Sequence, residues 1–105
     1  MIYNRSGAQY TCCGVTYTIG GRVYANNESI YEGLYGVIRE IRTGEDMETD
    51  NDTPDFYCDF IPPVVSDERK IIENRFTRFW RTEKRLEDLD LEMVIMDPYM
   101  LVVLD

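Results

Sequence analysis

Three cysteines have the strongest nucleophilic and metal-binding chemistry in this chain: Cys12, Cys13 and Cys58. The chain contains no histidine, so histidine general bases, catalytic triads and histidine-ligated metal sites are excluded. A cysteine nucleophile would need some other group to lower its thiol pKa. We therefore interpret the cysteines as buried strand residues, and we predict a protein that is not an enzyme and has no cofactor.

The adjacent pair Cys12 and Cys13 is also unfavourable for two other uses of sulfur. A disulfide between neighbouring residues closes a strained ring, and three cysteines cannot all pair within one chain. Neighbouring residues of a strand point to opposite faces of a sheet, so the two thiols are poorly placed to share one zinc ion. The sequence predicts neither a disulfide framework nor a zinc site.

Acidic residues alternate along the polar segment 44–55, which we call the acidic loop. Its candidate partner-binding residues are Asp46, Glu48, Asp50, Asp52 and Asp55. The alternation is similar to a calcium loop, because hard cations prefer several carboxylate oxygens. However, the sixth position from Asp46 is Asn51 rather than glycine, and the twelfth is Tyr57 rather than glutamate. The pattern therefore predicts an exposed loop without a specific calcium site.

The cations gather elsewhere, since seven of the eleven lysines and arginines lie between residues 69 and 85. Lys70, Arg78 and Arg81 lie on the polar face of a predicted helix. Two interpretations stay open. The face is either solvated and neutralised by the acidic loop, or it docks a charged partner in a fixed orientation.

Composition limits the class of partner. The 105 residues fit one domain, with 44% hydrophobic residues to form a core. Twenty acids against eleven bases give a net charge of -9, which disfavours direct binding of nucleic acid and of anionic membranes. No apolar run approaches a membrane span, and residues 1–5 lack a secretory signal. We expect a cytoplasmic protein with a protein partner, including a basic nucleic-acid-binding one; the oligomeric state is left open.

In the first half of the chain we expect strands. Residues 8–26 read as a hairpin that turns at Gly20-Gly21, because β-branched and aromatic residues flank the glycine pair. Residues 34–43 and 56–61 read as two further strands joined by the acidic loop.

In the second half we expect one helix and two late strands. The helix spans 66–81, starts with Ser66 as its N-cap, and packs on the sheet through one apolar face. That face consists of Ile71, Ile72, Phe76, Phe79 and Trp80. Residues 91–104 add the late strands that complete the sheet. The predicted class is α+β: a bent, mainly antiparallel sheet of about five or six strands, either closed as a small SH3-like barrel or open, with one packed amphipathic helix.

Part of the sequence resembles a known family. The run YEGLYGVIREIRTGEDMETDNDTPDFYCD and the later FIPPV and LEMVIM segments are similar to small proteins carried by conjugative elements of gut bacteria, of the large polyvalent protein-associated domain type. The resemblance covers residues 31–97 and contains no catalytic signature. It implies the accessory cargo of a mobile genetic element, and it assigns a function to no individual residue.

Two functions remain as hypotheses. The first is a non-enzymatic, accessory protein-interaction domain of a mobile element. The second is an acidic inhibitor that mimics nucleic acid and occupies the basic groove of a host nucleic-acid-handling or defence protein.

Overall fold

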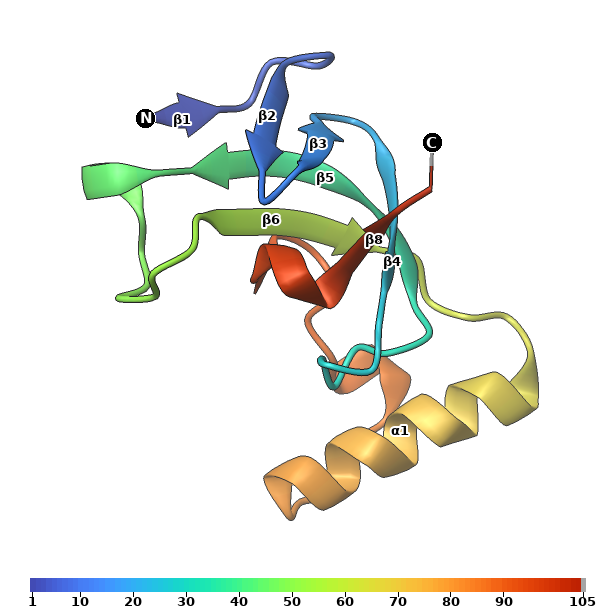
Figure 1. Cartoon of the computed structure of the whole chain (residues 1–105). Coiled ribbons are helices and arrows are strands. Elements are labelled where there is room, and N and C mark those ends of the chain that lie inside the picture. The colour runs from blue at the N-terminus through green and yellow to red at the C-terminus, as the bar shows by residue number, and fades with distance from the viewer. Residues whose placement is uncertain (105) are drawn as a thin grey trace.

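Eight short strands and one α-helix form the protein in a computed structural model that describes residues 1–104. The strands are β1 (Ile2–Tyr3), β2 (Gln9–Cys12), β3 (Val15–Thr18), β4 (Arg22–Ala25), β5 (Tyr35–Arg42), β6 (Asp55–Phe60), β7 (Val94–Met96) and β8 (Leu101–Val103). The helix is α1 (Ser66–Trp80), and the 3-10 turns are η1 (Gly44–Asp46), η2 (Leu86–Asp88) and η3 (Pro98–Met100). The predicted α+β class is confirmed (Figure 1).

Six of the strands form one antiparallel sheet in the order β7-β6-β5-β4-β8, with β1 paired to the far end of β5. The long strand β5 pairs with β6 along its length and carries a register shift between Ile38 and Glu40, which bends the sheet as β-bulges do. Gly36 allows the close approach of these strands, because a Cβ there would lie 2.3 Å from the carbonyl oxygen of Asp59. Within residues 1–104 no pairing joins the edge strands β7 and β8, so the sheet is not closed.

The N-terminal hairpin forms, but the predicted position of its turn at Gly20-Gly21 is wrong. Strand β2 pairs with β3 around Cys13 and Gly14, which both have positive φ. Strand β4 instead pairs with β5 and β8. The glycine pair Gly20-Gly21 leads the chain from the hairpin into the sheet, where its backbone exchanges hydrogen bonds with Ile38. The tight turn therefore forms where two successive residues take the left-handed conformation, which Gly14 adopts without strain.

The main core lies inside the bent sheet, where Phe56, Ile38, Ile41 and Met96 are fully buried. The hairpin contributes Tyr17, whose ring contacts Phe56 edge to face at 4.6 Å. The Tyr17 hydroxyl donates a hydrogen bond to the carbonyl oxygen of Pro98, at 3.2 Å. The hairpin is thus attached to the sheet by aromatic packing and to η3 by this hydrogen bond.

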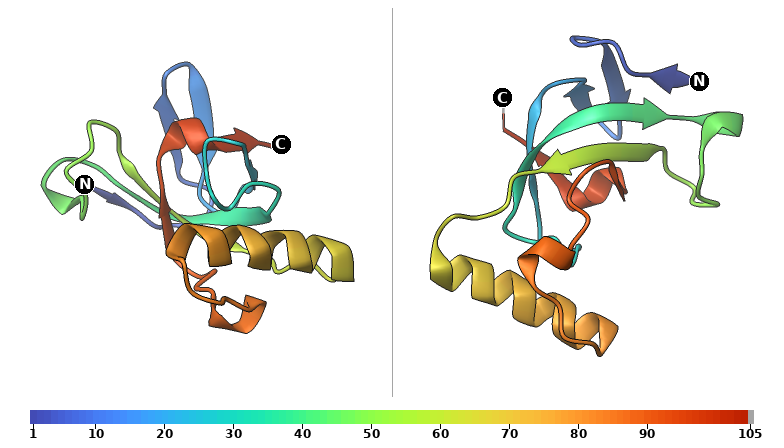
Figure 2. Two further views of the ribbon diagram at one scale, coloured as in Figure 1. Left: turned by 90° about the horizontal axis from the view of Figure 1, so that it is seen from below. Right: turned by 180° about the vertical axis from the view of Figure 1, so that it is seen from behind.

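Helix α1 lies beyond one end of the sheet rather than across its face (Figures 1 and 2). Its buried residue Phe76 contacts Tyr31, which stacks on Phe60 at the end of β6. The Arg75 guanidinium donates hydrogen bonds to the carbonyl oxygens of Ile30 and Glu32. The helix is therefore held by the β4–β5 connection and by the end of one strand.

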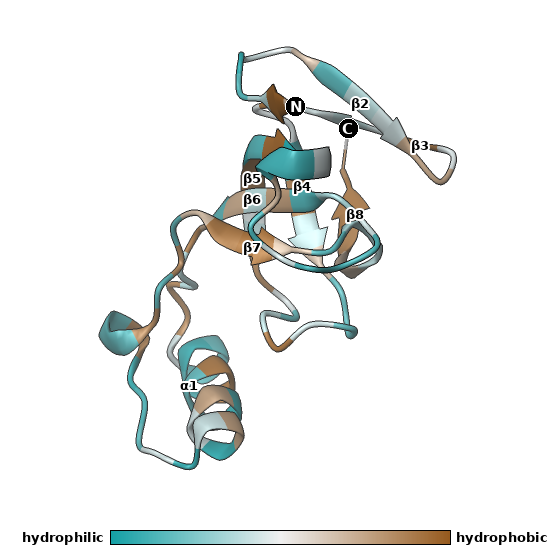
Figure 3. Cartoon of the chain, turned by 90° about the vertical axis from the view of Figure 1, so that its left-hand side faces the viewer, coloured by the Kyte–Doolittle hydropathy of each residue, from teal (hydrophilic) through white to brown (hydrophobic). Residues whose placement is uncertain are grey.

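The helix has almost the predicted bounds, but the predicted N-cap and buried face need correction. Ser66 lies inside the helix, and Val65 is the N-cap residue without a side-chain cap. Ile72 and Phe76 are buried, whereas Ile71, Phe79 and Trp80 are each more than half exposed. Figure 3 shows apolar and polar residues interleaved along α1. Because the packed contact is short, it covers only the middle of the predicted apolar face.

No helix in residues 1–104 has both the length and the apolar character needed to cross a membrane.

Candidate binding surfaces

The acidic loop is organised around Asp55, which the sequence placed among the exposed partner-binding acids. Asp55 is fully buried, which corrects that prediction. Its Oδ2 accepts hydrogen bonds from the backbone amides of Glu48 (2.7 Å) and Thr49 (3.1 Å), and its Oδ1 accepts one from the Thr49 hydroxyl (2.5 Å). A buried carboxylate needs such donors to offset the loss of hydration. Asp55 therefore shapes the loop and is not available to a partner.

A second carboxylate holds the tip of the same loop. One oxygen of Asp97, Oδ1, accepts hydrogen bonds from the Asn51 amide nitrogen and the Thr53 hydroxyl, both at 3.0 Å. Asp97 precedes η3, so these bonds tie the loop to the segment between β7 and β8. The loop is held at both its base and its tip.

The remaining predicted acids of the loop are exposed. The Asp46 carboxylate lies 2.6 Å from the Met1 nitrogen, and the Glu48 carboxylate lies 3.2 Å from the Arg42 guanidinium. Asp50 and Asp52 form no ion pair with any residue in the described part of the chain. Among the predicted acids of the loop that are exposed, these two are the ones without a cation beside them.

The ring of Tyr57 is buried beneath the loop, and the Arg42 guanidinium lies over this ring, 4.8 Å from its centroid. The Tyr57 hydroxyl has no hydrogen-bond partner in residues 1–104. Burial raises the pKa of Tyr57 to about 12; Glu48 and Asp55 add to this rise and Arg42 opposes it. Tyr57 therefore stays neutral at physiological pH and acts as a packing residue under the loop.

The predicted basic residues lie on or directly after α1. Lys70, Arg78 and Arg81 are exposed, and none of them forms an ion pair within residues 1–104. Arg81 ends the helix in the left-handed conformation, with φ of 55°. The acidic loop and α1 lie on different sides of the molecule (Figure 1), so the loop does not neutralise these cations.

Two aromatic residues at the end of the helix were missed as surface residues by the sequence analysis. Phe79 and Trp80 are each 57% exposed, and their rings contact each other edge to face at 5.2 Å. With the neighbouring Arg78 and Arg81 they form what we call the aromatic end of α1. The helical wheel places both rings on the apolar face, so periodicity alone cannot show that they lie beyond the packed contact.

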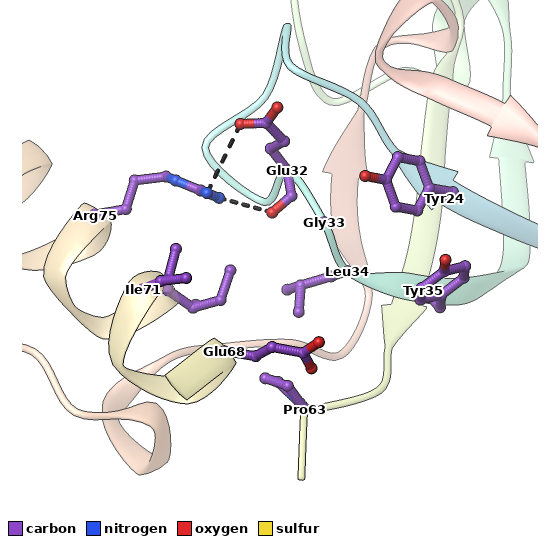
Figure 4. Close-up of a pocket in the computed structure, with 10 residues that line it drawn as sticks. Tyr24, Glu32, Gly33, Leu34, Tyr35, Pro63, Glu68, Ile71 and Arg75 are labelled. Atoms are coloured by element: carbon purple, nitrogen blue, oxygen red, sulfur yellow. Dashed lines mark hydrogen bonds and ion pairs between the residues drawn. The ribbon is translucent and has the colours of Figure 1, made fainter. Parts of the chain in front are cut away.

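A groove of about 490 Å³ lies between the first half of α1 and the β4–β5 connection (Figure 4). Leu34, Ile71 and the ring of Tyr35 supply its apolar surface, and Glu68 lies at its rim. Arg75 closes one side, because it bonds the Glu32 carbonyl and lies 3.7 Å from the Glu32 carboxylate.

No group of three or more acidic or cysteine side chains in residues 1–104 is placed to hold a metal ion. Burial raises the pKa of the Cys58 thiol to about 12, so this cysteine is unreactive as a nucleophile. The residues that line the groove include neither a cysteine nor a serine.

Comparison with protein-family models, with curated proteins and with solved structures finds no match for this chain. The geometry of the surfaces is therefore the basis for the functional argument.

Proposed function

We propose that this chain is a non-enzymatic protein-interaction domain that binds its partner through the aromatic end of α1. The observation that carries the proposal is the exposure of Phe79 and Trp80, the latter the single tryptophan of the chain. Leaving two large aromatic rings in water forgoes burial that would stabilise the fold, by about 1.5–3 kcal/mol for a large apolar side chain. A partner that covers both rings would recover that free energy.

The surroundings of the two rings favour the same proposal. Tryptophan and arginine are enriched among the residues that dominate binding energies at protein interfaces. Arg78 and Arg81 flank the rings and have no ion pair in residues 1–104. On a chain of net charge -9, a local basic patch orients the approach of an acidic partner. We infer an acidic protein as the partner.

The biological setting rests on the resemblance of residues 31–97 to accessory proteins of conjugative elements. We propose that the partner belongs to the machinery of such an element in the cytoplasm. We also propose that the sheet is an open SH3-like barrel, a fold that often serves as a binding scaffold. The strand order β7-β6-β5-β4-β8 supports this assignment, as does the 3-10 turn η3 that connects β7 to β8 in the chain.

The second candidate function is the acidic inhibitor that mimics nucleic acid. The exposed and unpaired carboxylates of Asp50 and Asp52 favour it, because the contacts to Asp55 and Asp97 hold them in place. Such an inhibitor would bind a basic nucleic-acid-binding protein through the loop and would leave the aromatic end of α1 free.

Site-specific photo-crosslinking in the native host tests the first proposal. A photoreactive phenylalanine analogue at position 80 should crosslink one protein, whereas the same analogue at exposed Asn74, on another face of α1, should not. With that protein purified, Trp80→Ala should weaken binding by about 2 kcal/mol, roughly thirtyfold. The matched control is Tyr99→Ala on η3, since Tyr99 is 56% exposed but lies outside α1.

The same assay separates the two functions. If Asp50→Asn with Asp52→Asn abolishes binding to the captured protein while Trp80→Ala has no effect, the proposal of binding through α1 is wrong and the acidic inhibitor is favoured. Circular dichroism of each variant establishes that the fold is retained.

A further inference from the structure

We propose that Cys12 and Cys13 form a dithiol site that binds a trivalent arsenical through both sulfur atoms. The two Sγ atoms lie 3.7 Å apart at the tip of the β2–β3 hairpin. Cys13 is exposed, Cys12 is partly exposed, and both are free thiols. This site is independent of the function proposed for α1, because the hairpin and the helix lie at opposite ends of the molecule (Figure 1).

The local backbone brings the sulfurs together. In a regular strand, neighbouring side chains point to opposite faces, and the sequence therefore predicted two separated thiols. Strand β2 ends at Cys12, and Cys13 takes the left-handed conformation with φ of 54°. This conformation turns the second side chain toward the first, which corrects the expectation that the two thiols point to opposite faces of a strand.

A disulfide bond between Cys12 and Cys13 is unfavourable, so it does not prevent the two thiols from binding a ligand. The Cα atoms of adjacent residues lie about 3.8 Å apart across a trans peptide, whereas disulfides span about 4.4 Å or more between Cα atoms. A bond between Cys12 and Cys13 would therefore be strained and readily reduced. The two thiols stay available under reducing conditions.

The number of sulfur atoms at the site and their protonation state decide which class of ligand it binds. Within residues 1–104, no third acidic or cysteine side chain completes a metal cluster at this pair, and the chain has no histidine. Metal ions need thiolates, but burial and the neighbouring Cys13 raise the pKa of Cys12. A trivalent arsenical with one organic substituent requires two sulfurs and reacts with neutral thiols.

The reaction balances without an oxidant or a reductant. In an arsenical R–As=O, the arsenic–oxygen bond breaks and two arsenic–sulfur bonds form. Both thiol protons leave on the oxygen as one molecule of water, and arsenic stays trivalent. The product is a ring that contains arsenic, both sulfurs and the backbone between Cys12 and Cys13.

The test uses phenylarsine oxide and the full chain under reducing conditions. Mass spectrometry should show one phenylarsenic group per chain, with the loss of two titratable thiols. A small dithiol should remove the group, whereas excess monothiol should not. Cys12→Ser and Cys13→Ser should each weaken apparent binding by about 100-fold or more, as loss of one of two linked contacts does. The matched control is Cys58→Ala, which should bind like the natural chain because Cys58 is fully buried.

Two results would overturn the proposal. One is an adduct that monothiol removes as easily from the natural chain as from Cys12→Ser, which would show that only one sulfur binds. The other is tight one-to-one binding of Zn²⁺ that both serine variants lose, which would assign the pair to a metal ion instead.

Discussion

The acidic loop and the aromatic end of α1 carry opposite charges, and the fold uses these charges in different ways. In the loop, Asp55 and Asp97 each accept hydrogen bonds from loop residues. At the end of α1, Arg78 and Arg81 make no ion pair within residues 1–104, and the two rings between them are exposed. A charged side chain therefore indicates a binding surface only where it makes no hydrogen bond or ion pair within the fold.

The largest expected difference is in the loss of stability when each of two phenylalanines, one helical turn apart, is truncated. Phe76→Ala should destabilise the domain by about 3–5 kcal/mol, because Phe76 is buried against Tyr31. Phe79→Ala should cost less than about 1 kcal/mol, because Phe79 is already 57% exposed. Urea titrations of both variants measure the difference. Equal losses would show that the end of α1 is packed and is no free surface.

A smaller difference is expected inside the acidic loop. Asp55→Asn should cost about 2–3 kcal/mol, since it replaces a charged acceptor of three hydrogen bonds and leaves donors unpaired. Asp52→Asn is the matched control and should change stability by less than about 0.5 kcal/mol, because Asp52 is exposed. If the two variants are equally stable by thermal melting, Asp55 does not organise the loop.

The pH dependence of stability under alkaline conditions tests the burial of Cys58 in β6, the strand that follows the acidic loop. The Cys58 thiol has an ordinary pKa of 9.0 and keeps its proton in the folded state up to a pKa of about 12. The unfolded chain loses this proton first, so the stabilisation is present below pH 9 and declines as the pH rises toward 12. The loss is about 1.4 kcal/mol per pH unit for one group. Between pH 9 and 10, Cys58→Ala should reduce this slope in urea titrations; an unchanged slope would contradict the assignment.

The smallest expected effect is that of calcium on the loop. The Asp55 carboxylate already accepts three hydrogen bonds, and no group of three or more acidic side chains in residues 1–104 is placed to hold a metal ion. Addition of millimolar calcium, or of a chelator, should leave the melting temperature unchanged. A rise of many degrees with one-to-one binding by calorimetry would show that the loop rearranges around the ion.

The sequence by itself determined the features that depend on local pattern. The α+β class, the helix near residues 66–81 and the strands on each side of the acidic loop follow from periodicity, glycine and proline positions, and residue type. The segregation of cations into residues 69–85 is likewise a property of the printed chain.

Only the tertiary structure decided which of these residues are available to a ligand. Phe76 and Phe79 share one face of the helix, but the contact with Tyr31 covers only the first of them. Asp52 and Asp55 belong to one acidic run, but the three donors from Glu48 and Thr49 enclose only the second. Exposure depends on which groups the folded chain brings against each side chain, and a pattern of residue types along the sequence does not specify those contacts.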